Sequence, residues 1–302
     1  MDSASRNPSR SGFARAAALA LLAAAPLAGC AELSGSPRVG SKNFTEELIL
    51  GELYAQSLER RGLRVARRLD LGATAIAMLA LQRGDVDLYP EYTGTALLDV
   101  LHQAPIADPQ LAYRTVARAY RERFGLVWLA PAPFDDSQAL AATAATAARR
   151  ALRTLSDVAR AAPQLTLGTV PEFLHRADGL PGLQRVYGGF RFRRIVQLDN
   201  GVKYDALLRG AVDVVVAFTT DGEIDTDRLV VFADDKHLFP AYQAAPVVRP
   251  AALAAHPQIA PALDALAPRL TTAAMRRLNR EVDGPAQREP ADVARDFLDE
   301  HG

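Results

Sequence analysis

Two pairs of carboxylates are the residues of this sequence that come nearest to catalytic chemistry. Asp85 lies two positions before Asp87, and Asp234 is followed directly by Asp235. Paired carboxylates can carry general acid–base catalysis. However, the first pair flanks the start of a predicted strand, and the second lies in a predicted turn before Lys236. The sequence also shows no nucleophile–base arrangement and no phosphate-binding loop, so we expect a protein that is not an enzyme.

Cysteine, histidine and the charge balance exclude several other functions. The single cysteine, Cys30, excludes an intrachain disulfide and a zinc site built from cysteines, and the five histidines lack the spacing of metal ligands. The 35 basic and 35 acidic residues balance, and there is no long basic run, which argues against nucleic-acid binding. We therefore expect no metal, no cofactor and no nucleic-acid partner.

An internal repeat places two aromatic residues at equivalent positions. Residues 80–87 (ALQRGDVD) match residues 206–213 (ALLRGAVD), and the same offset aligns Tyr92 with Phe218, each followed by a threonine. Both copies predict a helix, a glycine that ends it, and a strand. Ligands of open α/β sheets bind beyond the carboxyl ends of strands. The two aromatic residues are therefore expected to point into a shared cleft.

Alternating helices and strands must position these residues. The predicted strands are 38–40, 64–71, 86–89, 126–129, 165–168, 191–198, 212–218, 229–233 and 245–248. Helices are predicted between them, including one that Thr45 can cap, and from Pro250 onward the chain is mostly helical. Two prolines at 130–134 indicate a crossover between two series of elements. This order predicts an α/β fold with largely parallel sheets covered by helices.

Five motifs follow one another along the chain: 40–46 (GSKNFTE), 89–95 (YPEYTGT), 172–180 (EFLHRADGL), 218–222 (FTTDG), and 234–236 (DDK) with Tyr242. In this order they resemble the motifs of the osmoprotectant-binding family, the substrate-binding proteins of ABC importers for glycine betaine, choline and related quaternary amines. The resemblance implies a two-lobed periplasmic-binding-protein fold of type II, with two mostly parallel sheets and two crossover segments. We expect lobe one at 38–134 and 240–302, and lobe two at 135–239.

The resemblance assigns an ammonium-binding cage to Tyr92, position 138, Phe218 and Tyr242, with Asp136 beside it. A quaternary ammonium group cannot donate a hydrogen bond, so aromatic faces hold it through cation–π contacts of about 0.5–2 kcal/mol each. Phe218 stands where the family usually has tyrosine, and Gln138 stands where it often has tyrosine. The expected cage therefore lacks one aromatic wall.

The resemblance also implies a carboxylate-binding set at Lys42, Thr95 and Arg176, with Glu172 nearby. All four positions hold the expected residue types, and charge-assisted hydrogen bonds are the stronger ones. We therefore expect the site to hold a carboxylate well, and a trimethylammonium group less well than a complete cage would. The ligand stays open among glycine betaine, choline, carnitine, other betaines and another zwitterion, such as an amino acid derivative.

Residues 1–29 have the features of a lipoprotein signal peptide. Three arginines precede an apolar run at 16–25 that is too short to span a bilayer. Residues 27–30 (LAGC) resemble the lipobox of bacterial lipoproteins, which implies a lipidated Cys30; the alternative is ordinary signal cleavage nearby, with Cys30 lost or inert. Residues 30–37 are then a tether. Residues 1–29 contain three arginines and one aspartate, so the remaining chain has a net charge of −2.

These predictions together describe an extracytoplasmic solute-binding subunit of an ABC importer, in the periplasm or at the cell surface. It is expected to be a monomer that is anchored to the membrane through Cys30. Its expected partners are a small zwitterionic or cationic ligand and the complex of permease and ATPase. The alternative is a ligand-binding sensory protein of the same fold, which the sequence does not separate from an importer subunit because both need the same cleft.

Overall fold

The computed structural model describes residues 35–224 and 228–300. The predicted signal peptide, Cys30 and the first part of the predicted tether lie outside the described residues. Within the described ranges, no helix has both the length and the apolar character needed to cross a membrane.

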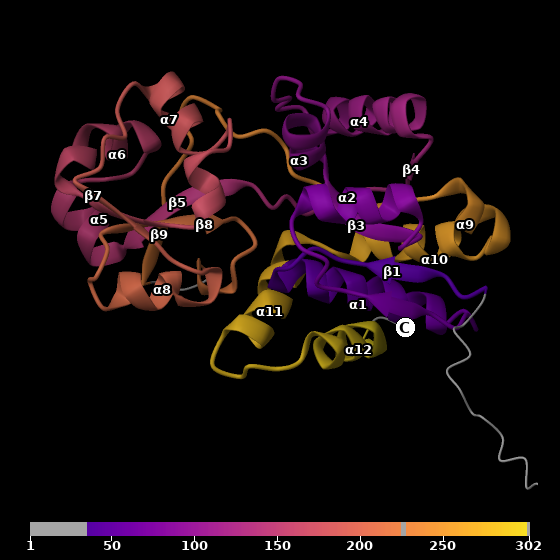
Figure 1. Cartoon of the computed structure of the whole chain (residues 1–302). Helices are drawn as coiled ribbons and strands as arrows, with labels where there is room; N and C mark the ends of the chain where they lie inside the picture. Colours follow the sequence, from indigo (N-terminus) through magenta and orange to yellow (C-terminus); the bar gives the residue numbers. More distant parts are fainter. Residues whose placement is uncertain (1–34, 225–227, 301–302) are drawn as a thin grey trace, which may run out of the picture. The chain divides into compact units, whose positions relative to one another are not determined.

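Two five-stranded sheets form the framework of the chain (Figure 1). The first sheet has the strand order β2-β1-β3-β10-β4, and the second sheet has the order β7-β6-β8-β5-β9. The first-sheet strands are β1 (Arg38–Gly40), β2 (Ala66–Arg68), β3 (Leu88–Tyr92), β4 (Val127–Trp128) and β10 (Ala244–Val248). The second-sheet strands are β5 (Gln138–Thr143), β6 (Thr166–Thr169), β7 (Arg194–Gln197), β8 (Val214–Phe218) and β9 (Leu229–Val231).

Each sheet contains one strand that runs against the other four. In the first sheet this strand is β10, which pairs antiparallel with β3 and β4, and in the second it is β5, which pairs antiparallel with β8 and β9. The remaining pairs, β1 with β2 and β3, and β6 with β7 and β8, are parallel. The chain passes from the first sheet to the second before β5 and returns before β10. The predicted α/β fold with two sheets and two crossovers is confirmed.

Helices cover both faces of each sheet. Successive strand residues point to opposite faces, so neighbouring residues of one strand pack against different helices. On the first sheet, Leu88 and Tyr92 pack with the core of α1 and α10–α12, whereas Tyr89 packs with α2 and α4. On the second sheet, Val216 packs with α6 and α7, and Val215 packs with α8. The helices on the first sheet are α1 (Thr45–Glu59), α2 (Thr74–Arg83), α4 (Pro109–Phe124), α9 (Pro250–Ala255), α10 (Ile259–Leu266), α11 (Thr272–Asp283) and α12 (Pro290–Glu300).

The other helices lie mostly between strands of the second sheet. They are α5 (Ala144–Arg150), α6 (Leu155–Ala161), α7 (Leu180–Tyr187) and α8 (Asn200–Leu208), with the single turns η2 (Ala162–Gln164), η3 (Pro171–Leu174), η4 (Gly222–Ile224) and η5 (Ala267–Arg269). After β3 the chain forms the one-turn α3 (Thr93–Thr95), which continues into a π-helix, η1 (Ala96–Val100).

The repeat in the sequence is a helix–turn–strand unit that occurs once in each sheet, as α2–β3 and α8–β8. Gly84 follows α2 with φ of 82°, and Gly210 lies beyond the end of α8 with φ of 73°. This left-handed conformation is open to glycine without strain, which explains why both copies carry glycine there. The unit places Tyr92 and Phe218 at the carboxyl ends of β3 and β8, as predicted.

Several local predictions are wrong. Strand β5 at 138–143 was not predicted, and the strand predicted at 191–198 is limited to β7 at 194–197. Thr45 does not cap α1: the N-cap is Phe44, and the Thr45 hydroxyl donates instead to Asp283 Oδ1 at 2.6 Å, at the end of α11. The strand predicted at 64–71 is limited to β2 at 66–68, because the β1 strand with which it pairs has only three residues.

Candidate functional site

All nine predicted ligand-binding residues lie in the wall of one cavity of about 1170 Å³. They are Lys42, Tyr92, Thr95, Asp136, Gln138, Glu172, Arg176, Phe218 and Tyr242. Strand ends of both sheets deliver them: Tyr92 ends β3 and Phe218 ends β8. The residues that the resemblance assigned to one site are therefore brought together, although they are spread over most of the chain.

Aromatic rings line part of this cavity. Phe218 and Gln138 are direct cross-strand partners between β8 and β5, so an amide stands beside the ring. The Phe218 ring already makes a cation–π contact within the protein, since Lys203 Nζ lies 4.7 Å from the centroid of the ring. The ring of Tyr242 lies against Gly94, where an added Cβ would approach the ring carbons to 2.5 Å. The polar groups around these rings thus restrict where a ligand cation can sit.

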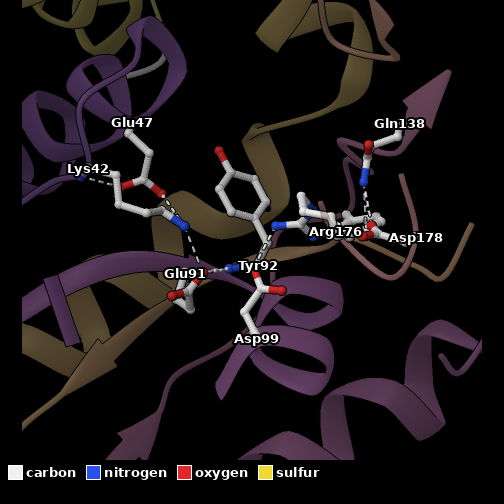
Figure 2. Close-up of polar contacts among 9 residues, drawn as sticks. Lys42, Glu47, Glu91, Tyr92, Asp99, Gln138, Arg176 and Asp178 are labelled. Atoms are coloured by element: carbon white, nitrogen blue, oxygen red, sulfur yellow. Dashed lines mark hydrogen bonds and ion pairs between the residues drawn. The ribbon is translucent and has the colours of Figure 1, made fainter. Parts of the chain in front are cut away.

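Lys42 is buried between two carboxylates (Figure 2). Its Nζ lies 2.7 Å from Glu91 Oε1 and 3.5 Å from Glu47 Oε1, and 4.7 Å from the centroid of the Tyr92 ring. Burial lowers the pKa of Lys42, but Glu47 and Glu91 outweigh it and raise that pKa above its ordinary value. Burial also raises the pKa of Glu47 to about 8. Lys42 is therefore a cation whose charge the protein itself balances.

Arg176 is likewise engaged by two acids (Figure 2). Its Nε and Nη2 donate to the two carboxylate oxygens of Asp178 at 3.0 and 3.1 Å, and its Nη1 donates to Asp99 Oδ2 at 2.5 Å. The buried Asp178 also accepts hydrogen bonds from Gln138 Nε2 and the Tyr242 hydroxyl. Gln138, Arg176 and Tyr242, all predicted site residues, thus share one carboxylate that the sequence analysis did not include.

Glu46 and Asp136 lie in the cavity wall with hydrogen bonds but no ion pair. The Tyr92 hydroxyl donates to Glu46 Oε1 at 2.7 Å, and the Thr220 hydroxyl donates to Asp136 Oδ1 at 2.6 Å. Among the residues that the structure describes, no Lys or Arg pairs with either carboxylate. Burial raises the pKa of Glu46, and burial together with the nearby Glu46 charge raises the pKa of Asp136 well above its ordinary value. Both acids therefore lack a compensating positive charge.

The cavity wall as a whole is acidic. Its described residues include seven carboxylates and two basic side chains, the latter being Lys42 and Arg176. The acidic members are Glu46, Asp99, Asp136, Glu172, Asp199, Asp221 and Asp283. Such a wall attracts cations and raises the local concentration of a positively charged ligand. The described residues contain no group of three or more His, Cys, Asp or Glu arranged to hold a metal ion.

Several residues of this network were missed by the sequence analysis, among them Glu47 and Glu91, which form ion pairs with Lys42. Glu46 and Asp178 fall inside the recognised motifs 40–46 and 172–180, so their positions were available as a signal. Asp99 follows the predicted Thr95 by one helical turn. Asn279, on α11, carries no signal in the sequence: its Nδ2 donates to Glu46 Oε2 at 2.8 Å and to the Thr220 carbonyl at 2.9 Å, so it joins the two sheets at the site.

A cavity whose wall comes from two α/β sheets, lined by aromatic rings and charged groups, is typical of a site for a small solute. The chain matches the family described as the substrate binding domain of ABC-type glycine betaine transport systems over residues 37–300. The chain therefore belongs to this family, whose members are extracytoplasmic subunits of importers and not enzymes. The predicted family, general function and absence of enzymatic activity are confirmed by this match.

Individual relatives agree with the family. The chain is 39% identical over 274 residues to the glycine-betaine-binding protein of Pseudomonas aeruginosa, with 87% of each chain covered. It is 31% identical over 264 residues to the carnitine transport binding protein OpuCC of Listeria monocytogenes, covering 86% of this chain and 85% of the relative. A crystal structure of a glycine betaine/carnitine/choline ABC transporter protein superposes with a TM-score of 0.76 at 31% identity, covering 88% of this chain and 98% of that one.

Proposed function

We propose that the cavity captures an osmoprotectant with a quaternary ammonium head and presents it to the permease of an ABC importer. The observation that carries this proposal is a pair of acids, the buried Glu46 and the half-buried Asp136, which lie beside Tyr92 without a basic partner. Relatives named for glycine betaine and carnitine support the same class of ligand.

A quaternary ammonium head matches this surrounding in two ways. Its fixed positive charge supplies the compensation that Glu46 and Asp136 lack, and it needs no hydrogen-bond acceptor. Its methyl groups can lie against the rings of Tyr92, Phe218 and Tyr242, where cation–π attraction is strongest in a desolvated site. A primary ammonium group would instead have to exchange its water molecules for protein acceptors.

The carboxylate of a betaine has a different environment. Thr95 is buried in the wall, and Arg176 is the more accessible of the two basic residues there, with 22% of its side chain exposed against 4% for Lys42. We therefore place the ligand carboxylate near Thr95 and Arg176, while Lys42 serves mainly to hold Glu91 and Glu47 in place. Glu172 is exposed at the rim, and it contributes only to the electrostatic potential in the cavity.

Titration calorimetry with choline and its uncharged carbon analogue, 3,3-dimethylbutan-1-ol, tests the proposal. The two molecules have nearly the same shape, so their affinities differ through the charge of the head. We expect choline to bind at least about tenfold more tightly, since a desolvated cation–π contact alone contributes about 2 kcal/mol. Equal affinity for the two compounds, or no binding of choline and glycine betaine at millimolar concentration, would contradict the proposal.

Substitution of Asp136 adds a control for the role of the acids. Asp136→Asn should weaken choline binding and leave the alcohol unaffected. Asp264→Asn makes the same charge change outside the cavity, where Asp264 accepts a hydrogen bond from the Ala130 backbone. It should bind choline like the unmodified protein.

The wider assignment includes a lipid anchor at Cys30, a monomeric state and the lobe boundaries 38–134 with 240–302, and 135–239. The lipobox-like residues 27–30 support the anchor, and the passage of the chain between the sheets near 130–137 and 232–243 supports the boundaries.

A further inference from the structure

Arg176 is the residue near which we place the carboxylate of a betaine. It already forms an ion pair with Asp99, which follows a strand of the other sheet. Asp99 lies in η1, which follows first-sheet strand β3, whereas Arg176 follows second-sheet strand β6 and η3. We propose that Asp99 is an internal competitor for ligand carboxylates on Arg176, and that it shifts the preference of the cavity from zwitterions toward cations without a carboxylate. This inference rests on the proposed function.

The two acids on Arg176 are not equivalent. Asp178 receives two hydrogen bonds from the guanidinium, further ones from Gln138 and Tyr242, and its side chain is only 2% exposed. Asp99 makes a single contact with Nη1, and 34% of its side chain is exposed. Asp178 is therefore a fixed part of the site, and Asp99 is the acid that an entering carboxylate can displace.

The surroundings of Asp99 weaken its hold on Arg176. Burial and the neighbouring acids Asp178 and Glu91 raise the pKa of Asp99, more than the positive charge of Arg176 lowers it. A carboxylate in such a place is repelled by part of its environment while it is attracted by the arginine. A ligand carboxylate that binds Nη1 of Arg176 would be repelled in the same way as long as Asp99 stays beside this guanidinium group.

The local backbone brings Asp99 to the position of the ligand. Asp99 follows Thr95 by four residues, and α3 continues directly into η1, so both side chains lie on neighbouring turns. The turn that holds Asp99 is a π-helix, a geometry that often marks functional sites. Thr95 and Asp99 both line the cavity, so a carboxylate held near Thr95 lies close to the Asp99 carboxylate as well.

The experiment compares glycine betaine with choline, which share the trimethylammonium head but differ in the carboxylate. In Asp99→Asn and Asp99→Ala, glycine betaine should bind about fivefold more tightly, which is the upper range for one partly exposed ion pair. Choline should bind equally well or slightly more weakly, since the cavity has lost a negative charge. Two variants are used because an asparagine can keep a hydrogen bond from Arg176, whereas an alanine cannot.

A matched control removes the same charge elsewhere in the wall. Asp283 lines the cavity and accepts a hydrogen bond from Thr45, with no contact to Arg176. In Asp283→Asn, the affinity for glycine betaine should change less than in Asp99→Asn, and the ratio of glycine betaine to choline affinity should stay near that of the unmodified protein. Circular dichroism and thermal melting of each variant verify that it is folded.

The outcomes separate this inference from the proposed function. If the unmodified protein binds neither ligand, the proposed function fails. If it binds them, but the Asp99 variants bind glycine betaine no more tightly, or Asp283→Asn strengthens glycine betaine binding just as much, then Asp99 is not a competitor on Arg176.

Discussion

Gly94 is predicted to set the position of the Tyr242 ring and thereby the affinity for a quaternary ammonium ligand. A Cβ at position 94 would lie 2.5–2.8 Å from three ring carbons of Tyr242, whereas ordinary contacts begin near 3.4 Å. In Gly94→Ala the ring must move by about 1 Å, although it is buried and its hydroxyl is bonded to Asp178. Overpacking of this kind costs about 1–3 kcal/mol of stability.

Loss of this ring as a cage wall should weaken choline binding by about tenfold, the middle of the range for one cation–π contact of about 0.5–2 kcal/mol. Calorimetry measures the affinity, and thermal melting measures the stability. Gly201→Ala is the control, because a Cβ there meets no atom within 4 Å and the residue lies on α8. It should leave choline affinity unchanged and the melting temperature equal or higher.

A double variant distinguishes a positioning role from a general loss of structure. In a Tyr242→Ala background there is no ring to displace, so adding Gly94→Ala should cost no further affinity. The reasoning is refuted if Gly94→Ala binds choline as well as the unmodified protein does, or if Gly94→Ala causes the same loss in the absence of the Tyr242 ring.

Two further predictions concern pH and the membrane. Choline affinity should fall as the pH is lowered. The positive charge of the ligand favours the ionised forms of Glu46 and Asp136, and burial raises the pKa values of both groups. Choline affinity is therefore highest above the pKa values of these groups in the free protein, and it is lost as the pH falls through them. Calorimetry in buffers of different ionisation enthalpy should show proton release on binding, and a pH-independent affinity would argue against it. In cells, Cys30→Ala should move the chain from the membrane fraction to the soluble extracytoplasmic fraction, and unchanged membrane attachment would exclude lipidation at Cys30.

The fold followed from the sequence because its determinants are local. The run of β-branched residues in β8, the helix-ending Gly84 and Gly210, and the repeated ALxRGxVD motif each act over a few residues. Element ends were less accurate, as for β2, since pairing with the short β1 determines its length.

The composition of the site could be predicted only in part. The family resemblance located the nine residues that line the cavity, but it did not reveal that protein carboxylates already form ion pairs with Lys42 and Arg176. Those ion pairs depend on side chains from distant elements, as does the bridge that Asn279 forms between Glu46 and Thr220. The charge of the cavity therefore depends on how the folded chain packs, and it cannot be predicted from the spacing of residues in the sequence.

The place of β10 inside the first sheet has a consequence for the order of folding. All strands of the second sheet lie within residues 138–231, so that sheet can be completed from one continuous stretch of chain. The first sheet has β3 and β4 early in the sequence but needs β10 to fill the gap between them. Until residue 248 has left the ribosome or the export channel, β3 and β4 present open edges that can pair wrongly. The half of the protein that is synthesised first is thus finished last, and long-range contacts of this kind slow folding.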